Sequence, residues 1–299
     1  MLALVCLCPV AGAGTYHLYF LGGQSNMDGY GYVNELPTEM QGPVEGVMIF
    51  CGHRQRDGEA STGQGIWAPL TPGFGAGCDT DGQSNHLGDR FGPELTFARR
   101  LRMLRPDEKI AIIKYARGGS SLDVRVAGGA GTWDPHDTRG SGALRGVNQY
   151  DHALAAIRSA TAVRDIDGDG EDDTLVPSGI LWMQGETDGT NEATANAYAG
   201  HLAGLAELLR AAMRVDELPF VIGRISDRAV NLHEGERIWA FGDTVRAAED
   251  KVAADDAAAA IVTSTDNYGY SDPWHYDTPG YIDFGRKFAE AMDGLMGNP

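Results

Sequence analysis

The sequence predicts a single α/β domain in which a parallel sheet lies between two layers of helices. Short apolar runs alternate with helix-like segments along the 299 residues, and this alternation implies parallel strands joined by right-handed crossovers. The runs are hydrophobic at both odd and even positions, which is typical of strands covered on both faces. Hydrophobic residues make up 42% of the chain, which is enough material for a core.

Five apolar runs are expected to form about five parallel strands, and the segments between them are expected to form helices. The strands are expected over residues 16–21, 110–115, 180–184, 220–224 and 260–264. The helices are expected over residues 93–104, 151–163, 193–214 and 238–252. A last helix is expected to start with Thr278 as its cap and Pro279 as its first helical residue. Its apolar residues then recur at steps of three and four, the period of a helix with one buried face.

Two long segments interrupt this alternation. Residues 29–92 and 118–149 are rich in Gly, Pro, Asp and Ser and show little periodicity, so we expect loops there, and long loops in a compact domain are usually functional. The expected architecture is a three-layer α/β/α domain, flavodoxin-like in outline, over residues 14–299. In such sheets a site lies beyond the carboxyl ends of the strands.

The N-terminal segment MLALVCLCPVAGAG is apolar and ends in small residues. This pattern indicates a shortened signal peptide over residues 1–13 and therefore a secreted or periplasmic protein. A buried first strand or the choice of start site would give the same pattern. Once the segment is removed, Cys51 and Cys78 remain as an even pair, for which a disulfide and two buried thiols are both open.

The charge of the chain limits its partners. The formal net charge is −18, from 24 Lys and Arg against 42 Asp and Glu. Nucleic acids and anionic membrane surfaces need a basic face, so both are excluded as expected partners. The chain also lacks an apolar run of about 20 residues, the length of a membrane span. Neutral or cationic partners remain, and the sequence does not determine the oligomeric state.

The first motif that could carry chemistry follows the first expected strand. It reads Gly22-Gly23-Gln24-Ser25-Asn26-Met27. A serine on a tight glycine turn can act as a nucleophile beside backbone N–H groups that would face an oxyanion. The alternative is a glycine turn whose serine only caps the next helix. The motif is not the G-x-S-x-G elbow of α/β-hydrolases.

The second motif, Asp272-Pro273-Trp274-His275, lies between the last expected strand and the last helix. A serine nucleophile needs a base, and histidine suits this role because its reference pKa is about 6.5. Asp272 is three residues before His275 and can accept a hydrogen bond from the other ring nitrogen. A histidine alone would indicate only a surface or packing residue.

Two weaker motifs follow other strands. Residues 182–188 read Trp-Met-Gln-Gly-Glu-Thr-Asp, in which Gln184 could donate its amide hydrogen to an oxyanion and Glu186 could orient a base. Residues 116–122 contain Gly118 and Gly119, which would let a backbone N–H approach a substrate oxygen. Taken alone, each glycine indicates only a turn.

The four motifs together are more specific, because the carboxyl ends of parallel strands meet at one edge. In the combination GGQSNM, ARGGSSL, WMQGETD and DPWH, the chain resembles the SGNH hydrolase superfamily, in its branch of sialate O-acetylesterases and acetylxylan esterases. The resemblance covers about residues 16–292. Residues 133–135, Trp-Asp-Pro, are similar to a substrate-side segment of that branch.

The resemblance implies a role for each matching residue. Ser25 would be the nucleophile and His275 the general base, with Asp272 orienting His275 and Glu186 as the alternative acid. The oxyanion would be bound by the backbone N–H of Ser25, a backbone N–H of Gly118 or Gly119, and the side chain of Gln184. The residues implied in substrate binding are Gln24, Asn26, Arg117, Trp133, Glu186 and Trp274.

The implied reaction is removal of O-acetyl groups from carbohydrates through an acetyl-serine intermediate, without a catalytic cofactor. Acetylxylan, other acetylated polysaccharides and sialates are all open as substrates, although the acidic surface favours neutral sugars. A non-catalytic carbohydrate-binding relative and an SGNH esterase acting on a non-sugar ester are the alternatives. Trp133 and Trp274 could stack on sugars or belong to local core beneath the loops.

An acidic segment, Arg164 to Thr174, holds six carboxylates in nine residues. Its start matches the D-x-D-x-D-G pattern of a calcium loop, but the twelfth position is Val176 instead of the expected glutamate. The expected ligands of a structural calcium are Asp165, Asp167, Asp169, Glu171 and Asp173. The alternative is a solvated acidic loop without an ion.

Overall fold

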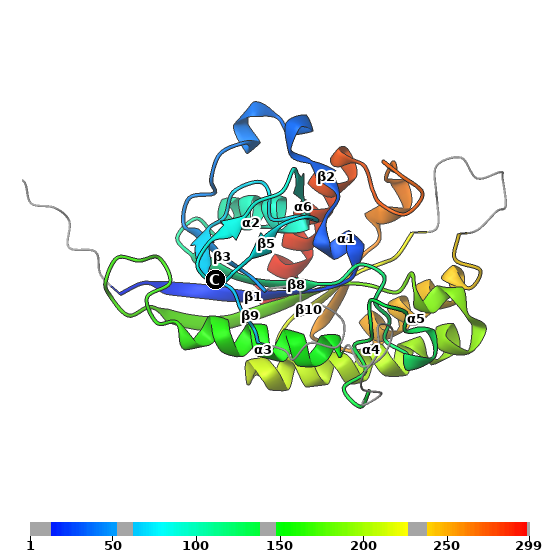
Figure 1. Cartoon of the computed structure of the whole chain (residues 1–299). Helices are drawn as coiled ribbons and strands as arrows, with labels where there is room; N and C mark the ends of the chain where they lie inside the picture. The colour runs from blue at the N-terminus through cyan, green and yellow to red at the C-terminus, as the bar shows by residue number, and fades with distance from the viewer. Residues whose placement is uncertain (1–12, 53–61, 138–147, 227–237, 298–299) are drawn as a thin grey trace, which may run out of the picture.

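A seven-stranded sheet divides the molecule into two helical layers (Figure 1). The computed structural model describes residues 13–52, 62–137, 148–226 and 238–297. Across the sheet, the strands are β11 (Ala259–Val262), β10 (Phe220–Gly223), β9 (Thr174–Met183), β1 (Thr15–Gly23), β8 (Lys109–Ala116), β3 (Val47–Cys51) and β4 (Trp67–Pro69). Adjacent strands are parallel except β3 and β4, which pair antiparallel at one edge.

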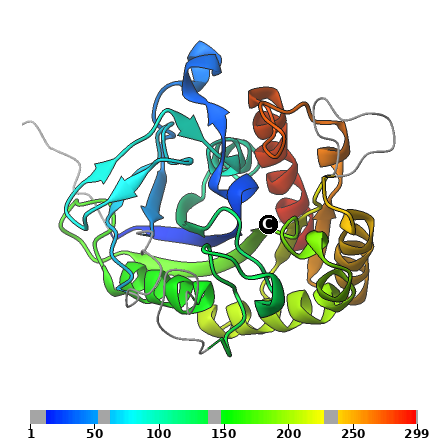
Figure 2. The same cartoon turned by 45° about the vertical axis from the view of Figure 1, so that its right-hand side comes forward.

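Helices cover both faces of this sheet. On one face α2 (Pro93–Leu104) and α6 (Thr278–Met296) pack against each other, and on the other lie α3 (Gln149–Ala162), α4 (Glu192–Met213) and α5 (Gly242–Asp255) (Figure 2). A single-turn helix, α1 (Ser25–Asp28), follows β1 directly. The predicted three-layer α/β/α architecture is therefore confirmed. None of the helices in the described ranges combines the length and apolar character that a membrane span requires.

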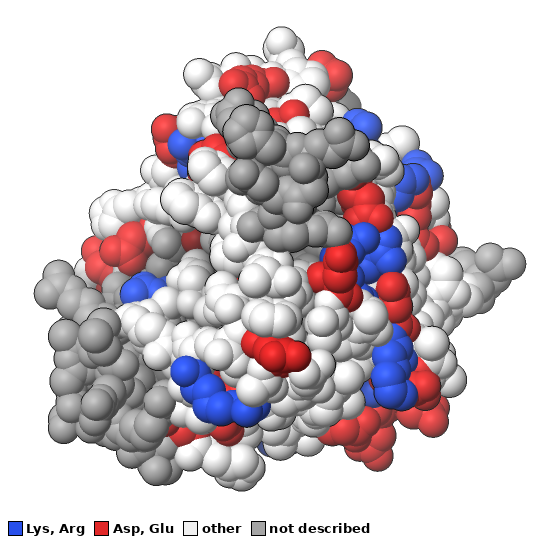
Figure 3. All heavy atoms as spheres, turned by 90° about the vertical axis from the view of Figure 1, so that its right-hand side faces the viewer, with Lys and Arg blue, Asp and Glu red and all other residues white. Residues whose placement is uncertain are grey.

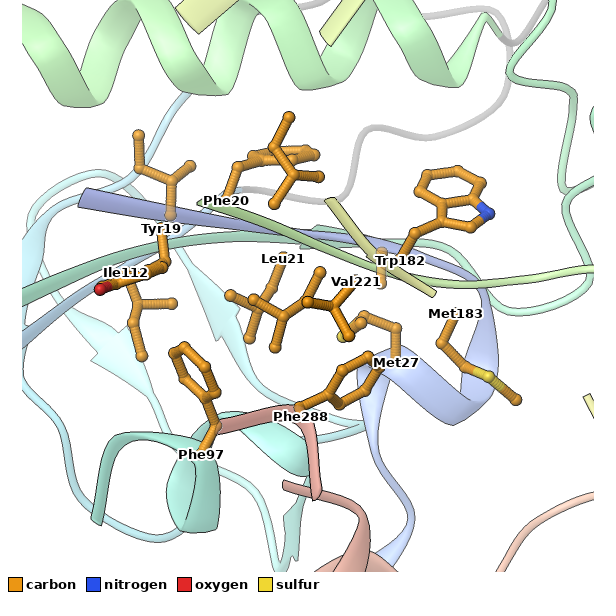
Figure 4. Packing of buried hydrophobic residues seen from close by; sticks show 14 of the residues in the cluster. Tyr19, Phe20, Leu21, Met27, Phe97, Ile112, Trp182, Met183, Val221 and Phe288 are labelled. Carbon is orange, nitrogen blue, oxygen red and sulfur yellow. The ribbon is translucent and has the colours of Figure 1, made fainter. Parts of the chain in front are cut away.

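The core fills the space between the sheet and the helices on both of its faces. Side chains of β1 alternate between the faces, so Tyr19 and Leu21 point toward Phe97 of α2 and Phe288 of α6, while Phe20 points to the opposite face (Figure 4). All five side chains are fully buried. The central position of β1 between β8 and β9 explains why both alternating sets of this strand are apolar.

The structure differs from the sequence prediction mainly within residues 29–92. That segment holds β3, whose run Val-Met-Ile-Phe is buried beside β8, and the prediction of a loop was wrong there because four apolar residues lie between Gly- and Pro-rich stretches. It also holds two short antiparallel pairs, β2 (Gly31–Tyr32) with β7 (Arg90–Phe91) and β5 (Asp79–Thr80) with β6 (Asn85–His86). Because β3 lies outside β8, the strand order departs from that of flavodoxin.

Smaller differences concern helix starts and cysteines. Helix α5 begins at Gly242 instead of residue 238, after a turn closed by the hydrogen bond from Gly242 N–H to Trp239 O. The cap of α6 is Asp277, one residue before Thr278, because its carboxylate accepts from Gly280 N–H. Within the described residues no disulfide joins Cys51 to Cys78. The predicted signal segment and its two cysteines lie almost entirely outside the described residues.

A buried ion pair connects β8 to the first turn of α2, and its lysine also binds the end of α1. Lys114 Nζ contacts Glu94 Oε2 at 2.7 Å and also donates to the carbonyl oxygens of Asp28 and Phe74, at 2.7 and 2.8 Å. Glu94 in turn accepts from Gly92 N–H. Both side chains are almost completely buried. This pair therefore fixes the end of the single-turn helix α1 to the sheet.

We expect Lys114→Met to lower the free energy of unfolding by about 3–5 kcal/mol, because Glu94 would remain as an uncompensated buried charge. The measurement is equilibrium urea denaturation of wild type and variant. Adding Glu94→Gln to Lys114→Met should restore most of the lost stability, since the remaining side chain is neutral. A single variant within about 1 kcal/mol of wild type would contradict an energetic role for the pair.

Candidate active site

The turn that carries Ser25 is held between β1 and its two neighbours. Gly23 has φ +145°, and a Cβ at this position would lie 2.0 Å from Met183 O, so only glycine fits here. Arg117 N–H donates to Gly23 O at 3.0 Å, and Gln24 N–H donates to Met183 O at 2.8 Å. These bonds place the first turn of α1 at the carboxyl edge of the sheet, with Ser25 as its first residue.

His275 and Asp272 form the hydrogen-bonded pair that their spacing predicts. His275 Nδ1 lies 2.7 Å from Asp272 Oδ2, and the backbone N–H groups of Trp274 and His275 donate to Asp272 Oδ1 at 2.8 and 2.9 Å. Partial burial opposes ionisation of Asp272, but these hydrogen bonds outweigh it and hold the pKa of the carboxyl below its usual value. The carboxylate is thus ionised and oriented toward the imidazole.

Tyr30 fixes the ring of His275 from one side. The two rings are stacked with centroids 3.6 Å apart and an angle of 1° between their planes. Tyr30 lies five residues after the proposed nucleophile, in the segment between α1 and β2. Sequence reasoning missed this residue, because an aromatic side chain in a loop gives no signal of which ring it will face.

Ser25, Tyr30 and His275 line one cavity of about 340 Å³. Ten residues form its wall: Gln24, Ser25, Tyr30, Gly118, Gly119, Glu186, Thr187, Trp239, Trp274 and His275. All four sequence motifs contribute to it, as expected from their place at the strand ends. Trp239, which precedes α5, is a second aromatic residue that sequence reasoning did not select. Trp274 is 51% exposed and is therefore available for contact with a ligand.

Gly118 lies directly against the turn that carries Ser25. A Cβ added to Gly118 would lie 3.3 Å from Ser25 Cβ, so the main chain of the two segments is in close approach. Ser25 is the first residue of its helix, where backbone N–H groups have no acceptor within the helix. The two main-chain segments therefore meet beside Ser25 on the wall of the cavity.

The structure does not place Gln184 or Trp133 at this cavity. Gln184 is completely buried, and its amide Nε2 donates to Asp188 Oδ2, Ser120 O and Gln24 Oε1. No donor remains for an oxyanion, so that predicted role is corrected. Trp133 is 1% exposed and packs edge-on against Trp182, with its Nε1 donating to the hydroxyl of Ser120. Trp133 is part of the core, and the predicted sugar contact is corrected as well.

Three other residues were predicted to bind the ligand: Arg117, Asn26 and Glu186. Arg117 does not line the cavity. Asn26 and Glu186 are 2% exposed, and Asn26 Nδ2 donates to Glu186 Oε1 at 2.8 Å. Among the described residues Glu186 makes no hydrogen bond with His275, whose ring nitrogen Nδ1 faces Asp272 instead. The geometry therefore favours Asp272 over Glu186 as the acid partner of His275.

Comparison with known proteins adds an independent line of evidence. Residues 15–294 match the family described as carbohydrate esterase, sialic acid-specific acetylesterase. This chain belongs to that family. No curated protein sequence matches it. The family match covers the turn that carries Ser25, the cavity and the Asp272–His275 pair, and the chain is accordingly a carboxylic ester hydrolase.

Solved structures support the same architecture for this esterase. A protein from Arabidopsis thaliana superposes with a TM-score of 0.63 at 18% identity, covering 92% of this chain and 97% of that one. A carbohydrate acetylesterase from Xanthomonas citri gives 0.62 at 17% identity, covering 94% of this chain and 56% of that one. NanS gives 0.54 at 16%, covering 95% and 98%. At these identities the likeness shows the fold, which is SGNH-like.

Two further carboxyls are buried behind the cavity of the esterase. Asp188 accepts from the backbone N–H groups of Leu122 and Asp123 at 2.9 and 3.0 Å, and burial raises its pKa to about 6. Burial also raises the pKa of Glu249 well above its usual value. Asp188 thereby connects the third motif to the loop after β8, which carries Gly118 and Gly119.

The acidic loop of the esterase lies at the opposite edge, beside the start of β1. Carboxylate oxygens of Asp165, Asp167 and Asp173 lie within 4.8 Å of one another. Tyr16 OH and Lys109 Nζ donate to Asp167 Oδ2, at 2.7 and 3.3 Å. Two other predicted ligands, Asp169 and Glu171, are not part of this cluster, because their carboxylates lie outside its radius.

Proposed function

We propose that the esterase removes O-acetyl groups from carbohydrates through an acetyl-serine intermediate. Ser25 attacks the acetyl carbonyl while His275 takes the hydroxyl proton and then gives it to the departing sugar oxygen. Water, activated by the same histidine, releases acetate in the second step. Asp272 holds the imidazole and stabilises its cationic form. The observation that carries this proposal is the contact between Asp272 and His275, at 2.7 Å, with His275 and Ser25 both on the wall of one cavity.

The oxyanion of the tetrahedral intermediate is bound by main-chain donors. We assign this role to the backbone N–H of Ser25 and to a backbone N–H of Gly118 or Gly119, because these segments meet beside the nucleophile. The side chain of Gln24 lines the same cavity and takes the place that sequence analysis gave to Gln184. Its Oε1 accepts from Gln184 Nε2 at 3.2 Å.

The cavity favours a neutral acetylated sugar, such as a unit of acetylxylan or of another acetylated polysaccharide. Three aromatic residues, Tyr30, Trp239 and Trp274, line it, and aromatic faces suit the apolar faces of sugar rings. Among its described lining residues there is no Lys or Arg to pair with a sialate carboxylate. Figure 3 shows the side of the molecule on which β1 ends, with much of the described surface in uncharged residues.

Acetate release from a panel of acetylated glycans tests this proposal. The panel contains acetylxylan, an acetylated neutral polysaccharide and an O-acetylated sialate, with Ser25→Ala as the blank. We expect release from the neutral polymers to exceed release from the sialate. Preference for the sialate would overturn the substrate assignment. Hydrolysis only of a non-sugar ester, or binding to the glycans without release, would favour the two alternative functions.

We also propose that the acidic loop binds a structural calcium ion through Asp165, Asp167 and Asp173. Six carboxylates in nine residues repel one another unless a cation neutralises them. Secretion through the predicted signal segment would place the loop in a calcium-rich compartment.

A thermal melt tests the calcium proposal. The midpoint should rise by several degrees in calcium over a chelator, because an ion that binds only the folded state stabilises it. Asp165→Asn should remove most of that rise, whereas Asp172→Asn, outside the cluster, should keep it. An equal midpoint in calcium and in chelator would show that the loop is a solvated acidic segment.

A further inference from the structure

Asn26 stands where four parts of the chain meet. It follows the proposed nucleophile in α1, and its side chain contacts Glu186 after β9, Trp274 in the histidine loop and Tyr281 in α6. The amide of Asn26 is 2% exposed. A side chain so deeply buried does not reach a ligand in the cavity, so the substrate contact predicted for it does not explain its position.

Every hydrogen-bonding group of this amide has a partner. Asn26 Nδ2 donates to Glu186 Oε1 at 2.8 Å and to Trp274 O at 3.2 Å, while Asn26 Oδ1 accepts from Tyr281 OH at 2.7 Å. A buried polar network in which each group is satisfied is rigid and specifies one arrangement. Loss of the amide would leave the hydroxyl of Tyr281 and the carboxyl of Glu186 without this partner.

One of these bonds connects the two halves of the reacting pair. Asn26 is the neighbour of Ser25, and Trp274 is the neighbour of His275, so the contact between Asn26 Nδ2 and Trp274 O joins the two loops directly. In sequence, the two residues are separated by 248 positions. Proton transfer between serine and histidine requires their relative position to hold within about 1 Å, beyond which rates fall about 100-fold.

Glu186 supports this contact through a single oxygen. Its Oε1 accepts from Asn26, whereas its Oε2 is buried and has no partner among the described residues. Burial raises the pKa of this carboxyl, which disfavours its charged form. The contact with Asn26 needs an acceptor oxygen only, and a neutral amide supplies one as well.

We propose that Asn26 is a positioning residue, which Glu186 and Tyr281 hold in place so that it fixes the nucleophile turn against the loop carrying His275. This inference rests on the proposed roles of Ser25 and His275. It assigns Glu186 to hydrogen-bond acceptance instead of the acid role in the triad. Neither Asn26 nor Glu186 takes part in the bonds that form or break.

Steady-state kinetics of Asn26→Ala on an aryl acetate test the first half of the proposal. We expect kcat to fall about 100-fold with KM nearly unchanged, because the substrate is bound but the reacting pair is misplaced. Asn148→Ala is the matched control, since Asn148 is also a buried asparagine with hydrogen bonds to the main chain. Tyr281→Phe removes one bond only and should lower kcat by less than Asn26→Ala does.

Two substitutions of Glu186 test the second half. Glu186→Gln keeps an acceptor oxygen and should retain kcat within a few-fold, with an unchanged acid limb in the pH profile of kcat/KM. Glu186→Leu removes the acceptor and should lower kcat as Asn26→Ala does, and the double variant Asn26→Ala/Glu186→Leu should be no worse than either single variant. Circular dichroism of each variant reports whether it folds.

The outcomes separate this inference from the proposed function. Wild-type kcat in a folded Asn26→Ala variant would overturn the positioning role while an inactive Ser25→Ala variant still supports the reaction. Equal losses in Glu186→Gln and Glu186→Leu would show that the charge is needed and would overturn the acceptor role. Activity in Ser25→Ala would instead remove the reaction on which the inference rests.

Discussion

Ser25→Ala should abolish hydrolysis of an aryl acetate while the protein keeps its fold. We expect kcat to fall by about five to six orders of magnitude, as when the nucleophile of other serine hydrolases is removed. In the proposed reaction the lost hydroxyl oxygen is the atom that bonds to the acetyl group. The other hydroxyl side chains on the cavity wall are those of Thr187 and Tyr30. The measurement is release of the aryl alcohol, followed by absorbance.

The matched control for this variant is Ser178→Ala. Ser178 lies on β9 away from the cavity, and its burial, at 7% exposed, is close to the 9% of Ser25. The control should hydrolyse the ester at nearly the wild-type rate. A Ser25→Ala variant with more than a few per cent of wild-type activity would show that another group is the nucleophile.

Asp272→Asn should lower kcat by about 10⁴-fold, because an amide in place of the carboxylate stabilises the wrong tautomer of the histidine. The structure gives this prediction a geometric basis, since Asp272 Oδ2 contacts His275 Nδ1 while Oδ1 accepts two backbone N–H groups. An asparagine can keep the latter two bonds through its oxygen, so the loop should keep its shape. Steady-state kinetics at several pH values measure the effect.

The same substitution also has a consequence for stability. The pKa of Asp272 is lowered in the folded protein, so its carboxylate stabilises the fold above the usual pKa of aspartate. That contribution is lost as the pH falls through the lowered pKa. Asp272→Asn should therefore reduce the free energy of unfolding at neutral pH more than in acid.

Equal activity of wild type and Asp272→Asn would contradict the assignment of Asp272 as the acid partner of His275.

The sequence was sufficient to predict that the four motifs meet at one cavity, because they follow strands of one sheet. A parallel sheet brings its carboxyl ends to one edge, and Ser25, Gly118 and Glu186 are neighbours because β8 and β9 flank β1. His275 and Asp272 are only three residues apart, and local geometry alone explains their contact. These inferences did not depend on details of loop structure.

The sequence was insufficient where loops and side-chain orientation decide. Tyr30 and Trp239 reach the cavity from irregular segments whose path no periodicity describes. Trp133 turns inward against Trp182, a choice that depends on packing across the sheet. Gln184 donates to Asp188 only because the turn after β9 folds back on itself. Strand β3 was missed because its four apolar residues lie between Gly- and Pro-rich stretches.

The arrangement of β1 and α6 determines when the enzyme becomes able to react. Ser25 follows the first strand of the domain, whereas His275 precedes the helix that closes it by packing against α2. During synthesis the proposed nucleophile therefore emerges long before the proposed base, and we expect a nascent chain not to hydrolyse esters. Refolding followed by ester hydrolysis should accordingly lag behind refolding followed by secondary structure, because activity reports the last long-range contact.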